Sequence, residues 1–288
     1  MRGESRLSRC LLCLQAAVVA LALLAGSAGG GEAPAAPGVE IERSEQFSTV
    51  EPGTTVFVRN EFGDVRARFG GYEGVVEVRA VLQQFASEGP RLEVEVVAGA
   101  AGLQVSVGER PAGAKLLRTE RQPGQKKRAD LVLFVPKGVH LVVATTDGEI
   151  QARGLRGDLR ARSLSGGIEA RSIRGDLDLA SVSGAIFAAP ESLDRRTVQR
   201  FASESGNITL RLAERGHFSC RATTRGWLST DFTLAIEADP AAPAAKRGLA
   251  TIGKGTTPLE VQSGVGHVRL KLRPSAEEAR RPAPGSPQ

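Results

Sequence analysis

The sequence has few residues that could crosslink the chain or build an aromatic core. Of 288 residues, three are cysteine, one is tryptophan, one is tyrosine and ten are phenylalanine. Because Cys10 and Cys13 lie near the N-terminus, a chain without its first residues keeps only Cys220 and forms no internal disulfide. Long helices are also disfavoured, since glycine is abundant and apolar residues alternate at strand spacing after Val39. The length and the 41% hydrophobic content still allow one or two domains with an aliphatic core.

The N-terminal apolar run is too short to cross a bilayer. Three arginines (Arg2, Arg6 and Arg9) precede an apolar run over residues 11–25, and small residues follow at 26–29. A membrane span takes about 20 apolar residues. The order of charged, apolar and small segments predicts a signal peptide over residues 1–28 and an exported, periplasmic or extracellular chain with no transmembrane span after cleavage.

Composition predicts an irregular segment after the signal peptide and another at the C-terminus. Residues 29–38 are rich in glycine, alanine and proline and predict a flexible linker. Residues 274–288 contain Pro282, Pro284 and Pro287 and predict a disordered tail.

A nine-residue rhythm predicts the architecture. Turn glycines recur at Gly148, Gly157, Gly166, Gly175 and Gly184, each followed by two apolar residues at strand spacing. The turns alternate between a Ser/Thr type and an Arg-Gly-Asp type, so the true period is 18 residues with two strands per coil. The pattern predicts an all-β chain with a β-solenoid (β-helix-like) of about 18-residue coils over 141–273.

Stacked coils should align equivalent residues in columns, for example Ile150, Ile168 and Ile186. Later repeats are looser, and residues 239–248 read as an excursion before a last pair of strands at 259–262 and 268–272. Ahead of the repeats, alternating apolar residues predict strands at 55–59, 75–82, 92–97, 103–107 and 131–135. We expect residues 39–140 to form an N-terminal β-strand cap region that covers the first coil.

Three segments carry a family resemblance: NEFGDV at 60–65, VLFVPKGV at 132–139 and TDGEI at 146–150, followed by repeated Ser-x-Ser-Gly-x-Ile units. With them the chain resembles the bacterial putative-adhesin family of β-strand-repeat proteins, a domain of unknown function. The resemblance covers residues 39–272. It implies an exported envelope protein with a β-solenoid fold, no established cofactor and no catalytic residues to carry over.

Several short motifs suggest ligands, but a structural interpretation is favoured for each. Residues 248–254 resemble a phosphate-binding loop without its Ser or Thr, and Pro258 excludes the following helix. The Arg-Gly-Asp triplets at 156–158 and 174–176 recur at the repeat turn, with too few aspartates for a calcium β-roll. His217 and Cys220 form only half of a zinc site. We therefore expect no metal and no cofactor.

The sequence favours a non-enzymatic role. Solenoid enzymes that cleave glycans need a pair of carboxylates and aromatic platforms, and no acid and base identify themselves here. A glycan-cleaving enzyme is the less favoured possibility. A structural or envelope-stress accessory protein that binds another protein is the main alternative to a binding, adhesin-like surface.

Charge offers the one positive indication of a ligand. Stacking should align Arg153 with Arg171 and Arg156 with Arg174, about 5 Å apart, with Arg160 and Arg162 joining them. Such a face predicts binding to anionic envelope glycans or lipid head groups rather than nucleic acid. The alternative is a solvated face that is neutralised by nearby carboxylates at positions 149, 158, 169 and 176.

Overall fold

The computed structural model describes residues 38–85, 90–110, 127–193, 196–213, 216–238 and 244–273. Within these ranges the regular elements are all strands, which confirms the all-β prediction. The described residues accordingly include no helix with the length and hydropathy that a membrane span requires. The predicted signal peptide over 1–28, the linker apart from Gly38, and the tail over 274–288 lie outside the described residues.

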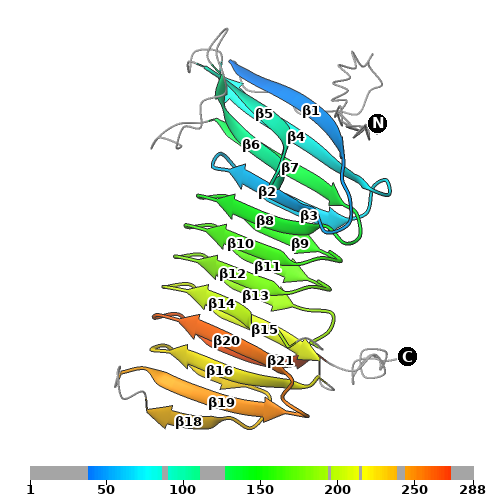
Figure 1. Cartoon of the computed structure of the whole chain (residues 1–288). Helices are drawn as coiled ribbons and strands as arrows, with labels where there is room; N and C mark the ends of the chain where they lie inside the picture. Colours follow the sequence, from blue (N-terminus) through cyan, green and yellow to red (C-terminus); the bar gives the residue numbers. More distant parts are fainter. Residues whose placement is uncertain are drawn as a thin grey trace, which may run out of the picture.

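The strands form two sheets that run the length of the molecule (Figure 1). Sheet A contains ten strands, in the spatial order β1 (Val39–Thr49), β4 (Val75–Phe85), β7 (Arg128–Val135), β3 (Val65–Phe69), β9 (Ile150–Arg153), β11 (Ile168–Arg171), β13 (Ile186–Ala189), β15 (Ile208–Ala213), β21 (Val268–Arg273) and β17 (Leu228–Thr230). Sheet B contains eleven strands, in the spatial order β18 (Ala235–Ala238), β19 (Lys246–Ile252), β16 (Phe218–Thr224), β20 (Thr257–Ser263), β14 (Gln199–Ser203), β12 (Leu177–Ser181), β10 (Leu159–Ser163), β8 (His140–Thr145), β2 (Thr55–Asn60), β6 (Gly102–Arg110) and β5 (Arg91–Gly99).

Between β8 and β15 the chain alternates between the two sheets, and each strand pairs in parallel with the next strand of its own sheet. Leu159 of β10 is in register with Leu141 and Leu177, which lie 18 residues before and after it. In sheet A, Ile168 is in register with Ile150 and Ile186 at the same interval. The predicted 18-residue period and its columns are therefore confirmed for this part of the chain.

The inward columns of both sheets form one apolar core. Ile150, Ile168 and Ile186 are at most 2% exposed, and the alanines two residues further along each strand are equally buried. Alternation along each strand places one side chain in the core and the next in solvent. The outward positions are consequently free to carry charge.

The turn glycines are needed for space rather than for an unusual backbone. A Cβ on Gly166 would lie 2.0 Å from the carbonyl oxygen of Gly148, and one on Gly184 would lie 2.0 Å from that of Gly166. Neither residue has a positive φ, unlike Gly138 or Gly154. Close stacking of the coils at this corner therefore excludes any side chain.

Buried hydroxyl groups hold the same corner together. Ser181 Oγ donates to the carbonyl oxygen of Gly166 at 3.2 Å and accepts the backbone N–H of Gly184 at 2.8 Å. Ser203 makes the equivalent bonds to Gly184 and Gly206 one coil further on. This explains the recurring Ser-x-Ser-Gly unit as a structural device that satisfies buried backbone groups.

At the C-terminal end, strand order in space differs from order along the chain. The last strands, β20 and β21, lie between the coil of β14 and β15 and the earlier coil of β16 and β17. Figure 1 shows orange β20 between the yellow strands β14 and β16. The expected last pair of strands exists, but it is not the end of the stack, which is closed in sheet B by β19 and β18, both antiparallel.

The N-terminal end is interleaved in the same way. Strands β2 and β3 lie inside the stack, where β2 pairs with β8 and β6, and β3 pairs with β9 and β7. Strands β1, β4 and β5 then extend the two sheets with antiparallel pairing. Both sheets therefore continue without a break across residue 140, where the cap region was expected to end.

The NEFGDV segment at 60–65 has a structural role in this arrangement. Asn60 is fully buried, donates to the carbonyl oxygens of Asp64 and Ala129 at 3.2 and 2.7 Å, and accepts the N–H of Phe62 at 3.1 Å. A Cβ on Gly63 would lie 2.4 Å from the oxygen of Ala129. The segment that carries the family resemblance thus forms the tight turn between β2 and β3.

Candidate functional site

The outer face of sheet A carries two columns of outward side chains across six consecutive strands, β3, β9, β11, β13, β15 and β21. Register defines the columns. One column consists of Arg66, Gln151, Glu169, Phe187, Thr209 and Arg269, and the other of Arg68, Arg153, Arg171, Ala189, Arg211 and Lys271. Seven of these side chains are cations and Glu169 is the one carboxylate.

The second column is a row of exposed cations with a single gap at Ala189. We call its five charged members, Arg68, Arg153, Arg171, Arg211 and Lys271, the cation column; all five are exposed. Arg171 forms an ion pair with Glu169. The other four have no carboxylate of the described residues within ion-pair distance, nor does Arg269 in the neighbouring column. The face therefore keeps a strong positive potential.

Phe187 spans the gap in the cation column. The guanidinium carbon of Arg171 lies 4.5 Å from the centroid of the half-buried Phe187 ring, and that of Arg211 lies 5.4 Å from it. A guanidinium group over an aromatic ring gains cation–π energy and loses rotational freedom. Phe187 consequently holds the two arginines on either side of Ala189 in fixed positions.

The outer face of sheet B has arginines too, but nearby carboxylates offset part of their charge. Asp178 forms ion pairs with both Arg160 and Arg162, at 3.2 and 2.6 Å. Arg200 pairs with Glu260 at 3.3 Å on the neighbouring strands. The two faces therefore differ in free charge, although both are rich in arginine.

The six arginines predicted to form one polyanion-binding face lie in three places. Arg153 and Arg171 are direct register partners in sheet A, as predicted. Arg160 and Arg162 do not join them, because they lie in sheet B and point from the opposite side of the molecule. The expected single face is thus corrected to one pair on each sheet and one pair at the turns.

Arg156 and Arg174 occupy the turns that lead from sheet A to sheet B. The guanidinium carbon of Arg156 lies 4.7 Å from the ring centroid of Phe69. Arg174 forms an ion pair with Glu191, and its hydrogen bond lowers the pKa of that carboxyl group while the pKa of Arg174 is raised. Arg174 is therefore already neutralised within the protein.

Sequence reasoning missed Arg68, Arg211 and Lys271, which lie outside the regular repeats. A local signal for Arg68 was present, since Val-Arg-Ala-Arg at 65–68 has the pattern of Ile-Gln-Ala-Arg at 150–153. Arg211 and Lys271 occupy the equivalent outward positions after Leu210 and Leu270. Their place in the cation column follows from strand register rather than from spacing along the chain.

The residues of the other candidate motifs form hydrogen bonds within the fold or are buried. In the Arg-Gly-Asp turns, Asp158 Oδ1 accepts the backbone N–H of Asp176, and Asp176 Oδ1 accepts from Thr197 at 2.6 Å. His217 Nδ1 accepts the backbone N–H of Lys254 at 3.0 Å. Cys220 is buried, and burial raises the pKa of its thiol to about 12.

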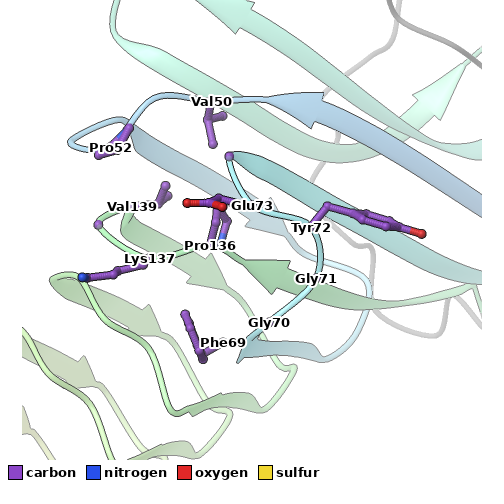
Figure 2. A pocket seen from close by; sticks show the side chains of 12 residues that line it. Val50, Pro52, Phe69, Gly70, Gly71, Tyr72, Glu73, Pro136, Lys137 and Val139 are labelled. Atoms are coloured by element: carbon purple, nitrogen blue, oxygen red, sulfur yellow. The ribbon is translucent and has the colours of Figure 1, made fainter.

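A cleft of about 680 Å³ lies beside the N-terminal end of the cation column. Its walls are Phe69 at the end of β3 and the turn that follows, including Glu73, the turn between β7 and β8, including Lys137, and residues Val50 and Pro52 (Figure 2). Figure 2 shows Tyr72 turned away from the other lining side chains. The walls are mainly apolar, with Glu73 and Lys137 as their charged residues.

Comparison with known proteins finds distant structural similarities, including those to two solved structures. No protein-family model and no curated protein matches the sequence. A solved structure described as a putative cell adhesion protein from Clostridium sporogenes is 13% identical, with a TM-score of 0.42, over 81% of this chain and 100% of that chain. Another, described as a putative adhesin from Bacteroides fragilis, is 12% identical, with a TM-score of 0.30, over 80% of this chain and 97% of that one. Membership of the putative-adhesin family remains a prediction from the sequence segments.

Proposed function

We propose that the protein is an exported, non-enzymatic β-solenoid of a bacterial envelope whose sheet A face binds anionic envelope polymers. The observation that carries the proposal is the cation column, in which Arg153 and Arg171 are register partners on a face with one carboxylate in its two columns. Export rests on the signal-peptide pattern at residues 1–28. The solenoid description rests on the 18-residue register of both sheets.

Charge repulsion within the column supports a polyanionic ligand. Adjacent strands lie about 4.8 Å apart, and two like charges at that distance repel by about 1 kcal/mol in water. Glu169 offsets the charge of Arg171, but no described carboxylate pairs with the register partners Arg68 and Arg153, so the repulsion between these two is unrelieved. A bound polyanion would relieve it at several positions at once and would release counterions.

The test compares two double variants of equal charge. Arg153→Gln with Arg171→Gln removes two cations from sheet A, and Arg160→Gln with Arg162→Gln removes two from sheet B. The probes are polygalacturonate, which is anionic, and dextran, which is neutral, with affinity measured at equilibrium. We expect the first variant to bind polygalacturonate at least about tenfold more weakly, which is about 1.4 kcal/mol, and the second to bind like the native protein.

Two results would contradict the proposal. Equal losses in both double variants would show that net charge alone drives association. Absence of any binding to polygalacturonate would remove the polyanion-binding role and favour the alternative of an accessory protein that binds another protein.

A further inference from the structure

We infer that the ligand of the cation column is a linear uronic-acid polysaccharide. The polysaccharide lies across the strands, along the axis of the stack. This inference rests on the proposed function and specifies its ligand. The column is one side chain wide and follows successive strands from β3 to β21. Five strand steps of about 4.8 Å give it a length of about 24 Å. A narrow row of charges at multiples of the strand spacing fits an extended polymer with regularly spaced anionic groups.

The chemistry of the cations favours carboxylates on a stiff chain. Four of the five charged groups are guanidinium groups, whose planar fork binds a carboxylate in a bidentate manner. One sugar ring of a linear polysaccharide is about as long as the spacing between strands, so a uronic-acid chain that lies along the column can place carboxylates at multiples of the strand spacing. A regular row of donors matched to a regular row of acceptors loses little freedom on binding.

Phe187 makes the row continuous where Ala189 interrupts it. Arg171 and Arg211 stand two strand steps apart, about 9.6 Å, and both guanidinium groups contact the Phe187 ring. The aromatic ring fixes their positions before the ligand arrives, so Phe187 is a positioning residue rather than a contact of the polymer. The two arginines then bind carboxylates on either side of the gap.

The observations favour a polymer over a lipid surface. The large exposed hydrophobic residues of the described chain include Phe69, Leu164 and Trp227, and none of them belongs to the two columns. A membrane-binding face combines cations with apolar groups that enter the headgroup region. The cation column therefore lacks the apolar anchors of such a face.

The experiment measures the affinity of the intact mature chain for galacturonic-acid oligomers of increasing length. We expect affinity to rise until the oligomer spans about 24 Å and to rise little beyond that. Phe187→Leu should weaken binding about fivefold, which reflects the loss of exposed cation–π contacts, while the slope of log affinity against log salt stays unchanged. Arg211→Gln should weaken binding and also reduce that slope.

The outcomes separate this inference from the proposed function. If polygalacturonate binds but neither oligomer length nor Phe187→Leu changes the affinity, the inference is overturned and the polyanion-binding function stands. Tighter binding to vesicles of phosphatidylglycerol than to polygalacturonate would overturn it in favour of a lipid surface. If no anionic probe binds, the proposed function fails first. Circular dichroism and thermal unfolding of each variant show whether it is folded.

Discussion

Asp158 Oδ1 accepts a hydrogen bond of 2.8 Å from the backbone N–H of Asp176, the residue at the same position one coil further on. The same relation links Asp64 Oδ1 to Glu149 N at 3.0 Å and Asn207 Oδ1 to His267 N at 2.8 Å. At these corners a side chain of one coil thus satisfies the backbone of the next. This stacking contact explains Asp158 of the first Arg-Gly-Asp triplet, whereas Asp176 of the second accepts from the side chains of Thr197 and Gln199 at 2.6 and 3.2 Å.

The contact between Asp158 and Asp176 predicts a stability difference between two substitutions. Asp158→Ala removes the acceptor and should lower the free energy of unfolding by about 1 kcal/mol, the typical net value of one hydrogen bond. Asp158→Asn keeps an acceptor oxygen and should retain most of that stability. Urea-induced unfolding measures both; equal losses would show that the negative charge, rather than the hydrogen bond, is what matters at this corner.

The glycines at the corner predict that alanine substitutions at Gly166 and Gly167 differ in their effect on stability. Gly166→Ala places a Cβ 2.0 Å from the carbonyl oxygen of Gly148, so the coils must separate, and we expect a loss of about 3 kcal/mol. Gly167→Ala meets the oxygen of Ala185 at 3.4 Å, an ordinary contact, and should change stability by less than about 0.5 kcal/mol. Thermal unfolding of the two variants distinguishes them, and similar melting temperatures would refute close stacking at Gly166.

The interleaved C-terminal coil predicts strong protection for strands late in the sequence. Because β20 and β21 have partners on both sides, their amide hydrogens should exchange about as slowly as those of β12 and β13. Strands β17 and β18, at the edges of the two sheets, should exchange faster. Native-state hydrogen exchange resolved by segment tests this order, and fast exchange in β20 would contradict the inserted position.

The buried Cys220 predicts resistance to thiol reagents and a loss of stability at high pH. Since burial raises the pKa of the thiol to about 12, the folded protein holds it neutral, whereas the unfolded chain ionises near the ordinary value of 9.0. This contribution to stability is complete below pH 9 and declines as pH rises from about 9 to about 12. Alkylation at pH 8 should therefore require unfolding, and rapid labelling of the native protein would show that the thiol is accessible. Cys220→Ala should flatten the alkaline decline.

The sequence predicts the strands and the period of the stack, but not the order of every coil. The 18-residue interval identifies register partners such as Ile150 and Ile168, because each strand stacks on its own repeat. Where β20 and β21 enter the stack depends on which strand edge remains free after β15, and spacing along the chain contains no information on that choice. The 18-residue repeat is less regular after Gly206, where successive strands along the chain no longer stack on one another.

The candidate site was predictable in part for a related reason. Local repetition aligns Arg153 with Arg171, whereas the separation of Arg160 from them depends on which sheet each strand joins. The difference in free charge between the two faces also depends on residues of different coils, since Asp178 pairs with Arg160 and Arg162 in sheet B. Contacts of this kind appear only once register is known.

The salt dependence of polygalacturonate binding tests the central claim most directly. For the native chain we expect log affinity to fall linearly with log salt, and the slope to be smaller in magnitude for Arg153→Gln with Arg171→Gln because fewer counterions are released. The matched variant Arg160→Gln with Arg162→Gln should keep the native slope, since both arginines lie in sheet B, away from the cation column. Identical slopes for all three proteins would contradict a binding face on sheet A.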